Sequence, residues 1–128
     1  QSGKKVEINL SGQDNLLTRV NCELFEWVIE NLIKNSLDAI ENGKGKIDIT
    51  VKAEKSNIEI EVTDNGKGID GKRRKDVFRP GYSTKRRGWG LGLSLSKRII
   101  EDYHNGKIFV KSSVINEGTT FKIVLKKV

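Results

Sequence analysis

Stretches of alternating hydrophobic and polar residues recur along the chain, each long enough for one strand of a sheet. Successive side chains of a strand point to opposite faces, so a half-buried strand shows a period of two. By this pattern we expect strands at residues 6–10, 16–20, 47–51, 58–62, 107–112 and 119–125. The polar segment 54–57 predicts an antiparallel hairpin between the two strands that flank it.

Two other stretches are expected to form helices. Residues 22–41 repeat apolar positions with a period near 3.6, Asn21 is the expected N-cap, and Asn42 with Gly43 marks the end. A second helix is expected from about residue 91 to 103. The elements together predict an α/β (α+β) two-layer sandwich, in which about three helices cover one face of a mixed, mainly antiparallel sheet of about five strands.

Length and composition indicate a single domain over residues 1–128. The chain is 35% hydrophobic and 32% charged, and it contains no apolar run long enough for a membrane span. No signal-peptide pattern opens the sequence, and a lone cysteine, Cys22, suits a reducing compartment. We therefore expect a cytoplasmic domain that makes no membrane contact itself, although its parent protein could be membrane-anchored.

The net charge of +7 would permit a nucleic-acid partner, but its distribution favours another reading. Between two glycine-rich segments lie eight basic residues: Lys72, Arg73, Arg74, Lys75, Arg79, Lys85, Arg86 and Arg87. A charge run is usually a solvated face, yet this position suits a small polyanionic ligand. The aromatic residues are scattered without the basic interleaving typical of base stacking, so no nucleic-acid partner is expected.

The first glycine-rich segment begins at Asp64, which ends an alternating stretch and precedes Gly66 and Gly68. A carboxylate there can accept a hydrogen bond from the exocyclic amine of adenine, although a plain turn explains the segment as well. Gly66, Gly68 and Gly71 also satisfy the spacing of the dinucleotide fingerprint. The required helix and acidic residue do not follow, and no Gly-Lys-Ser/Thr is present, so Rossmann and P-loop sites are rejected.

A polar stripe marks the first predicted helix, where Asn31, Asn35 and Asp38 follow one another at spacings of four and three residues. A carboxamide oxygen is a neutral hard ligand, and nucleotide-bound Mg²⁺ accepts only one or two protein groups. Asn35 is therefore a candidate Mg²⁺ ligand. Taken without the glycine-rich segments, Asn31 and Asn35 are better explained as buried structural amides that hydrogen-bond between the helix and the sheet.

These segments resemble, in order, the five sequence boxes of the histidine-kinase catalytic domain, which belongs to a wider ATPase group that includes DNA gyrase. The matching segments span nearly the whole chain and lie at residues 30–40, 64–69, 77–85, 88–93 and 118–121. A match to one box alone would be weak evidence for the resemblance, whereas matches to all five at compatible spacing are specific evidence. The resemblance implies an ATP-binding Bergerat fold with ATP and Mg²⁺ as cofactors.

Residue by residue, the resemblance makes Asn35 the Mg²⁺ ligand and Asn31 a helper near the phosphates, both catalytic, and places Asp38 where many sensor kinases have Lys or Arg. The adenine side would be formed by Asp64, Gly66, Gly68, Ile69 and Thr119. An ATP lid would span about residues 70–87 and include Phe78, Ser83, Thr84 and Lys85. The phosphates would meet Gly88, Gly90, Leu91, Gly92 and Leu93, where backbone N–H groups and a helix N-terminus favour anions.

The resemblance also bears on the reaction. Relatives that hydrolyse ATP carry a glutamate one turn before the Mg²⁺ asparagine, but this chain has Asn31, which cannot act as a general base. We therefore expect transfer to a histidine of a dimerisation domain in the same parent, with a response regulator downstream. His104 is expected to be a helix cap rather than the acceptor. The alternatives are a hydrolytic ATPase of the same superfamily and a Ser/Thr kinase of the anti-sigma-factor type.

Overall fold

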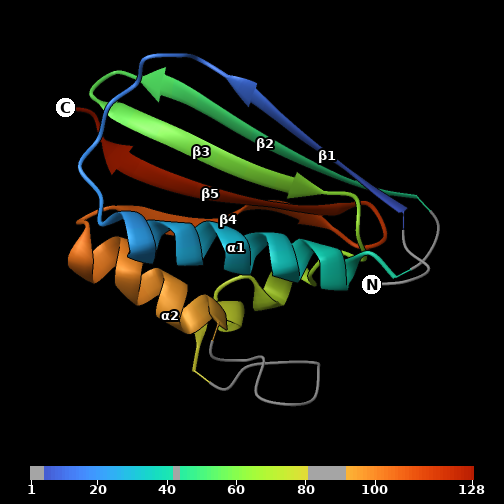
Figure 1. Ribbon diagram of the computed structural model, residues 1–128. Helices are drawn as coiled ribbons and strands as arrows, with labels where there is room; N and C mark the ends of the chain where they lie inside the picture. The colour runs from blue at the N-terminus through green and yellow to red at the C-terminus, as the bar shows by residue number, and fades with distance from the viewer. Residues whose placement is uncertain (1–4, 42–43, 81–91) are drawn as a thin grey trace.

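The computed structural model describes residues 5–41, 44–80 and 92–128 of the chain. Its helices lie on one face of a single sheet, as Figure 1 shows. The strands are β1 (Lys5–Gly12), β2 (Lys44–Glu54), β3 (Asn57–Asp64), β4 (Lys107–Val114) and β5 (Gly118–Lys126). The helices are α1 (Cys22–Ala39) and α2 (Gly92–Arg98), the latter continued by a π-helical segment (Ile99–Tyr103).

The sheet order is β1-β2-β3-β5-β4, with β1 parallel to β2 and every other pair antiparallel. The predicted hairpin is confirmed, with Glu54 opposite Asn57 next to its turn. The two-layer sandwich with a mixed, mainly antiparallel sheet is likewise confirmed. The sheet matters for the site because Asp64, at the end of β3, lies opposite Ile47 of β2 and Thr119 of β5.

The prediction of a strand at residues 16–20 was wrong. Leu16 and Val20 pack partly buried against the core, which accounts for the alternation. Among the described residues, however, the segment forms no ladder with any strand. It is bonded to the chain at the end of β5 instead: Thr18 Oγ1 donates to the Lys126 carbonyl, and Val128 N–H donates to the Leu17 carbonyl. An alternating pattern of buried and exposed residues thus arose here in a segment that does not pair with a strand.

The first helix forms as predicted, although it ends at Ala39 rather than at residue 41. Asn21 is confirmed as its N-cap, because its side-chain oxygen accepts the N–H of Leu24 at 3.0 Å. The helix buries Val28, Leu32 and Ser36 completely or nearly so. Its apolar face packs on the sheet and forms the centre of the core.

The second helical region has the expected extent but a different form, since its second half is π-helical. A third α-helix was expected, and the described part of the chain contains instead two short 3₁₀ turns, η1 (Gly71–Arg73) and η2 (Asp76–Phe78). Asp70 caps the first turn, and Pro80 lies two residues after the second. The residue before a proline disfavours helix, which explains why η2 ends there.

Candidate functional site

The carboxylate of Asp64 is buried, with 5% of the residue exposed, at the junction of β3, β5 and α1. Its Oδ1 accepts the N–H of Gly66 at 2.8 Å. Burial raises the pKa of Asp64, while the hydrogen bonds from the Gly66 N–H and the Thr119 N–H, and the nearby Ser36 hydroxyl, oppose that rise. A carboxylate held rigidly by neutral donors is a suitable acceptor for an amine of a ligand.

The glycines of this loop are required for close contact with the protein's own backbone. A Cβ at Gly66 would lie 2.7 Å from the carbonyl oxygen of Ala39 at the end of α1. Gly68 has a φ of +80°, and its Cβ would lie 2.3 Å from the carbonyl oxygen of Val114. The loop is thus clamped between α1 and the β4–β5 turn, and contact of these glycines with a purine stays a prediction.

Thr119 and Ile69, which sequence reasoning placed beside the adenine, are linked through Ser113. The Oγ of Ser113 lies 2.7 Å from Thr119 Oγ1 and accepts the Ile69 N–H at 2.7 Å. Ser113 and Ser36 were both missed from the sequence as site residues. The available signal was a serine at an otherwise apolar, buried position, and it is too common to be specific.

Asn31 and Asn35 stand one turn apart on α1, and Asn31 faces α2. Asn35 Nδ2 donates to the Asn31 carbonyl at 2.9 Å, and Asn31 Nδ2 donates to Ser96 Oγ at 3.3 Å. Both amides are half-buried, as is Asp38 farther along the helix. The structure therefore brings the predicted stripe into one line, and part of its hydrogen bonding is structural.

The start of α2 lies directly against this stripe. A Cβ at Gly92 would be 2.4 Å from Asn31 Oδ1, so only glycine fits without displacing that side chain. Phe78, the expected lid anchor, packs edge-on against Phe121 with ring centroids 6.0 Å apart, and Lys97 Nζ lies 5.6 Å from the Phe78 ring. The beginning of the expected lid is thus attached to the core.

Several predicted site residues lie outside the described residues, and the structure says nothing of them: Ser83, Thr84, Lys85, Gly88, Gly90 and Leu91. Leu93, the last of the predicted phosphate contacts, packs partly buried against the core. The structure therefore brings the predicted adenine side and the asparagine stripe together around the end of β3, α1 and the start of α2.

The one candidate metal ligand, Asn35, suits a metal ion that is already bound to a nucleotide. Within residues 5–41, 44–80 and 92–128, no three His, Cys, Asp or Glu side chains are placed to hold a metal ion. Since the Asn35 nitrogen is engaged with the Asn31 carbonyl, its oxygen is the atom suited to a cation. One neutral oxygen is a sufficient protein ligand where phosphates and waters supply the rest.

The described part of the chain contains no helix whose length and apolar character would let it cross a membrane.

Curated proteins similar to this chain are named as kinases. The chain is 37% identical over 122 residues to sporulation kinase B of Bacillus subtilis, covering 95% of this chain and 28% of that protein. It is 41% identical over 119 residues to the signal transduction histidine-protein kinase AtoS of Escherichia coli, covering 91% of this chain and 19% of that protein. The chain thus spans less than a third of the length of these relatives.

Solved structures agree with this likeness. The catalytic domain of histidine kinase ThkA, in a nucleotide-free form, matches with a TM-score of 0.84 and 29% identity over 95% of this chain and 79% of that one. A structure of ThkA in complex with the response regulator TrrA matches with a TM-score of 0.80 and 26% identity, over 96% of this chain and 34% of that one.

The family model described as histidine kinase-, DNA gyrase B- and HSP90-like ATPase matches residues 22–128. This range begins at the first residue of α1 and includes the asparagine stripe, Asp64, the start of α2 and Thr119. The fold and the resemblance of the five boxes are consistent with that match. The chain therefore belongs to the histidine kinase-, DNA gyrase B- and HSP90-like ATPase family, as a histidine-kinase ATPase domain.

Proposed function

We propose that this domain binds Mg²⁺-ATP and donates the γ-phosphoryl group to a histidine on a separate dimerisation domain of the same parent protein. Family membership supports ATP as the nucleotide, and the kinase relatives support a protein acceptor. Mg²⁺, the acceptor domain and a downstream response regulator are further parts of the proposal, as is a cytoplasmic location. ThkA, the structural neighbour, has been solved with such a regulator.

The observation that carries the proposal is the identity and packing of Asn31. It stands one helical turn before the candidate Mg²⁺ ligand Asn35, where hydrolytic relatives place a glutamate. Its side chain donates to Ser96 Oγ and lies against Gly92, so it is fixed between two helices. A neutral amide cannot take a proton from water, which favours transfer to an imported nucleophile over hydrolysis.

In this proposal, Asp64 accepts the N6 amine of adenine, and its fixed bonds to neighbouring backbone orient the carboxylate. Asn35 presents its carboxamide oxygen to Mg²⁺, which would neutralise phosphate charge when bound. Gly92 and Leu93, the first residues of α2, provide backbone near the phosphates. Phosphoryl transfer depends mainly on holding donor and acceptor in line and on charge neutralisation, so these positioning groups suffice.

A transfer assay tests the proposal. The domain is incubated with γ-labelled ATP and Mg²⁺, with the histidine-bearing domain of the parent protein supplied separately. We expect label on the acceptor in an acid-labile, base-stable bond, little free phosphate without the acceptor, and no label when the acceptor histidine is replaced by glutamine. Rapid release of labelled phosphate irrespective of the acceptor would show a hydrolytic ATPase instead, and label on serine or threonine would show the other alternative.

A further inference from the structure

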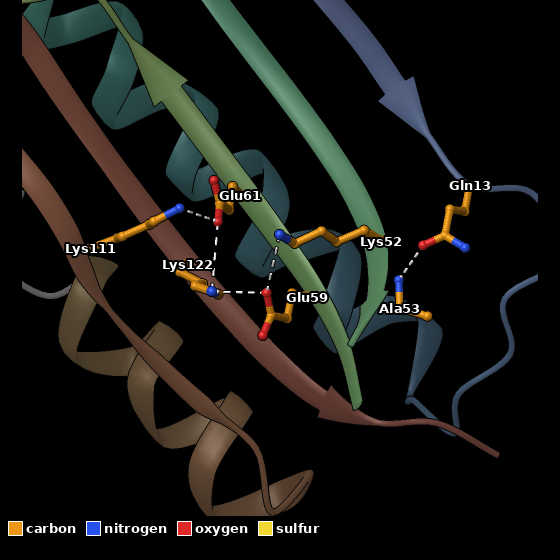
Figure 2. A network of polar contacts seen from close by, with 7 residues as sticks. All are labelled: Gln13, Lys52, Ala53, Glu59, Glu61, Lys111 and Lys122. Carbon is orange, nitrogen blue, oxygen red and sulfur yellow. Dashed lines mark hydrogen bonds and ion pairs between the residues drawn. The ribbon is translucent and has the colours of Figure 1, made fainter. Parts of the chain in front are cut away.

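The sheet face that the helices leave uncovered carries a ladder of ion pairs, in which Lys52, Lys111 and Lys122 each pair with Glu59 or Glu61. Figure 2 shows this ladder: Lys111 pairs with Glu61 at 2.8 Å, and Lys122 pairs with Glu59 at 2.8 Å. Lys52 lies 3.9 Å from Glu59. Although burial alone would raise the pKa of Glu61, its hydrogen bond to Lys111 and the nearby lysine charges lower it. Because every lysine of this ladder already has a glutamate partner, the ladder offers little to a charged partner.

Beside the ladder lies a hollow of about 540 Å³, formed where β3 begins, β4 begins and β5 ends. Among its lining residues are Glu59, which is paired with Lys122, and Lys107, Phe109, Lys122, Val124 and Lys126. In the β4–β5 register Phe109 is opposite Lys122 and Lys107 is opposite Val124, so Phe109 and Val124 are diagonal neighbours on one face. Phe109 remains 39% exposed, which gives the hollow an apolar floor open to a partner.

The cations around this floor are not balanced. Lys107 and Lys126 form no ion pair with any residue of the described ranges, in contrast to the ladder lysines. A further cation, Lys127, is held at the rim because its N–H donates to the carbonyl of Ser56, itself a lining residue. An exposed aromatic ring in a hollow that also contains two lysines without an acidic partner among the described residues, Lys107 and Lys126, complements an acidic surface that carries an apolar side chain.

We propose that this hollow docks an acidic, extended segment of another protein domain. One apolar side chain of the segment lies on Phe109 and Val124, and flanking carboxylates reach Lys107 and Lys126. The hollow contains a single aromatic side chain rather than a series for base stacking, which favours a protein over a single-stranded nucleic acid. The surface is independent of the proposed nucleotide site, and the interaction is weak and salt-sensitive because its ion pairs are exposed.

The test uses the peptide acetyl-Glu-Glu-Leu-Glu-Glu-amide, titrated into the ¹⁵N-labelled chain and followed by NMR. We expect shifts of the amides at residues 107–109 and 122–126 that vanish at high salt. Lys107→Ala combined with Lys126→Ala should weaken binding by roughly threefold to tenfold, as expected for two exposed ion pairs. Phe109→Ser should lower the affinity for the leucine-containing peptide and leave the affinity for pentaglutamate, which is lower from the start, unchanged.

The matched control is Lys44→Ala combined with Lys46→Ala, which removes the same charge from the same sheet face, at exposed positions where β2 begins. An equal loss in both double variants would reduce the effect to net charge and overturn the proposal. Shifts confined to other surfaces would do the same. Binding of oligo(dT) at the hollow without binding of the peptide would show that the partner class is wrong. Thermal unfolding of each variant checks that the sheet is intact.

Discussion

The imidazole of His104 joins the start of α1 to the end of the second helical region. Its Nε2 accepts the backbone N–H of Asn21 at 2.9 Å, and its Nδ1 lies 2.8 Å from the carbonyl oxygen of Ile99. Because Nε2 accepts, the proton is on Nδ1, which donates to Ile99. His104 is thus the C-cap of the π-helical segment, and both nitrogens are engaged in structural bonds.

Replacing this histidine tests that structural role. His104→Ala should lower the free energy of unfolding by about 1 to 3 kcal/mol, since two net hydrogen bonds are lost. Urea unfolding measures the loss, and Tyr103→Ala, at a side chain 67% exposed, is the control with little effect. Nucleotide affinity should stay unchanged. If the chain were phosphorylated on itself, and His104→Ala abolished that phosphorylation without lowering stability, His104 would be an acceptor and the structural assignment would be wrong.

The contact between Gly92 and Asn31 predicts a coupled effect. Gly92→Ala should destabilise the fold by about 1 to 3 kcal/mol, because the added methyl overpacks the amide. In the Asn31→Ala background, Gly92→Ala should lower the free energy of unfolding by less, and a double-mutant cycle measures the difference. Gly71→Ala is a matched control, since nothing lies within 4 Å of its Cβ position. Strict additivity of the two substitutions would show that they do not touch.

Burial of Asp64 predicts a pH dependence with a defined sign. Its pKa is raised above 3.8 in the folded state, so the native protein binds this proton more tightly than the unfolded chain. Its contribution to stability is therefore fully present below pH 3.8 and is lost as pH rises through the folded pKa. Asp64→Asn removes this titration and keeps an oxygen for Gly66. The stability of the original chain relative to the variant should fall with rising pH in urea titrations, and a rise would contradict the assignment.

The same substitution tests base recognition. An amide in place of the carboxylate still accepts one hydrogen bond, but it loses the charge that strengthens the bond to the adenine amine. Asp64→Asn should therefore weaken ATP and ADP binding more than GTP binding in calorimetric titrations. Equal loss for both bases would show that the residue does not read the purine.

The assignment of Asn35 as the Mg²⁺ ligand predicts how the affinity for ATP depends on the metal. With Asn35→Ala, the affinity for ATP measured with Mg²⁺ should approach that measured with EDTA, because the protein oxygen that prefers the metal-bound nucleotide is gone. Lys34→Ala, its exposed neighbour on the helix, serves as the control and should keep the Mg²⁺ effect. A full Mg²⁺ effect in the Asn35 variant would remove the ligand assignment.

Local signals explain what could be predicted along the chain. The cap at Asn21, the period of α1 and the hairpin between β2 and β3 depend on residues close in sequence, and the structure confirms each. The strand at 16–20 failed because a strand needs a neighbour that no local pattern reveals. The π-helical form of residues 99–103 likewise was not predictable, since no local pattern marks it and the carbonyl of Ile99 is capped by His104, which in turn is bonded to Asn21.

The sequence by itself determined most of the helices and strands, the order of the five boxes and hence the family, because periodicity, capping and glycine spacing are properties of short segments. Only the tertiary structure decided that Gly66 packs on Ala39, that Gly92 meets Asn31, and that Ser113 bridges Ile69 and Thr119. The physical reason is that such contacts depend on the relative placement of segments far apart in the chain. Burial and the donors on a carboxylate such as Asp64 follow from that placement alone.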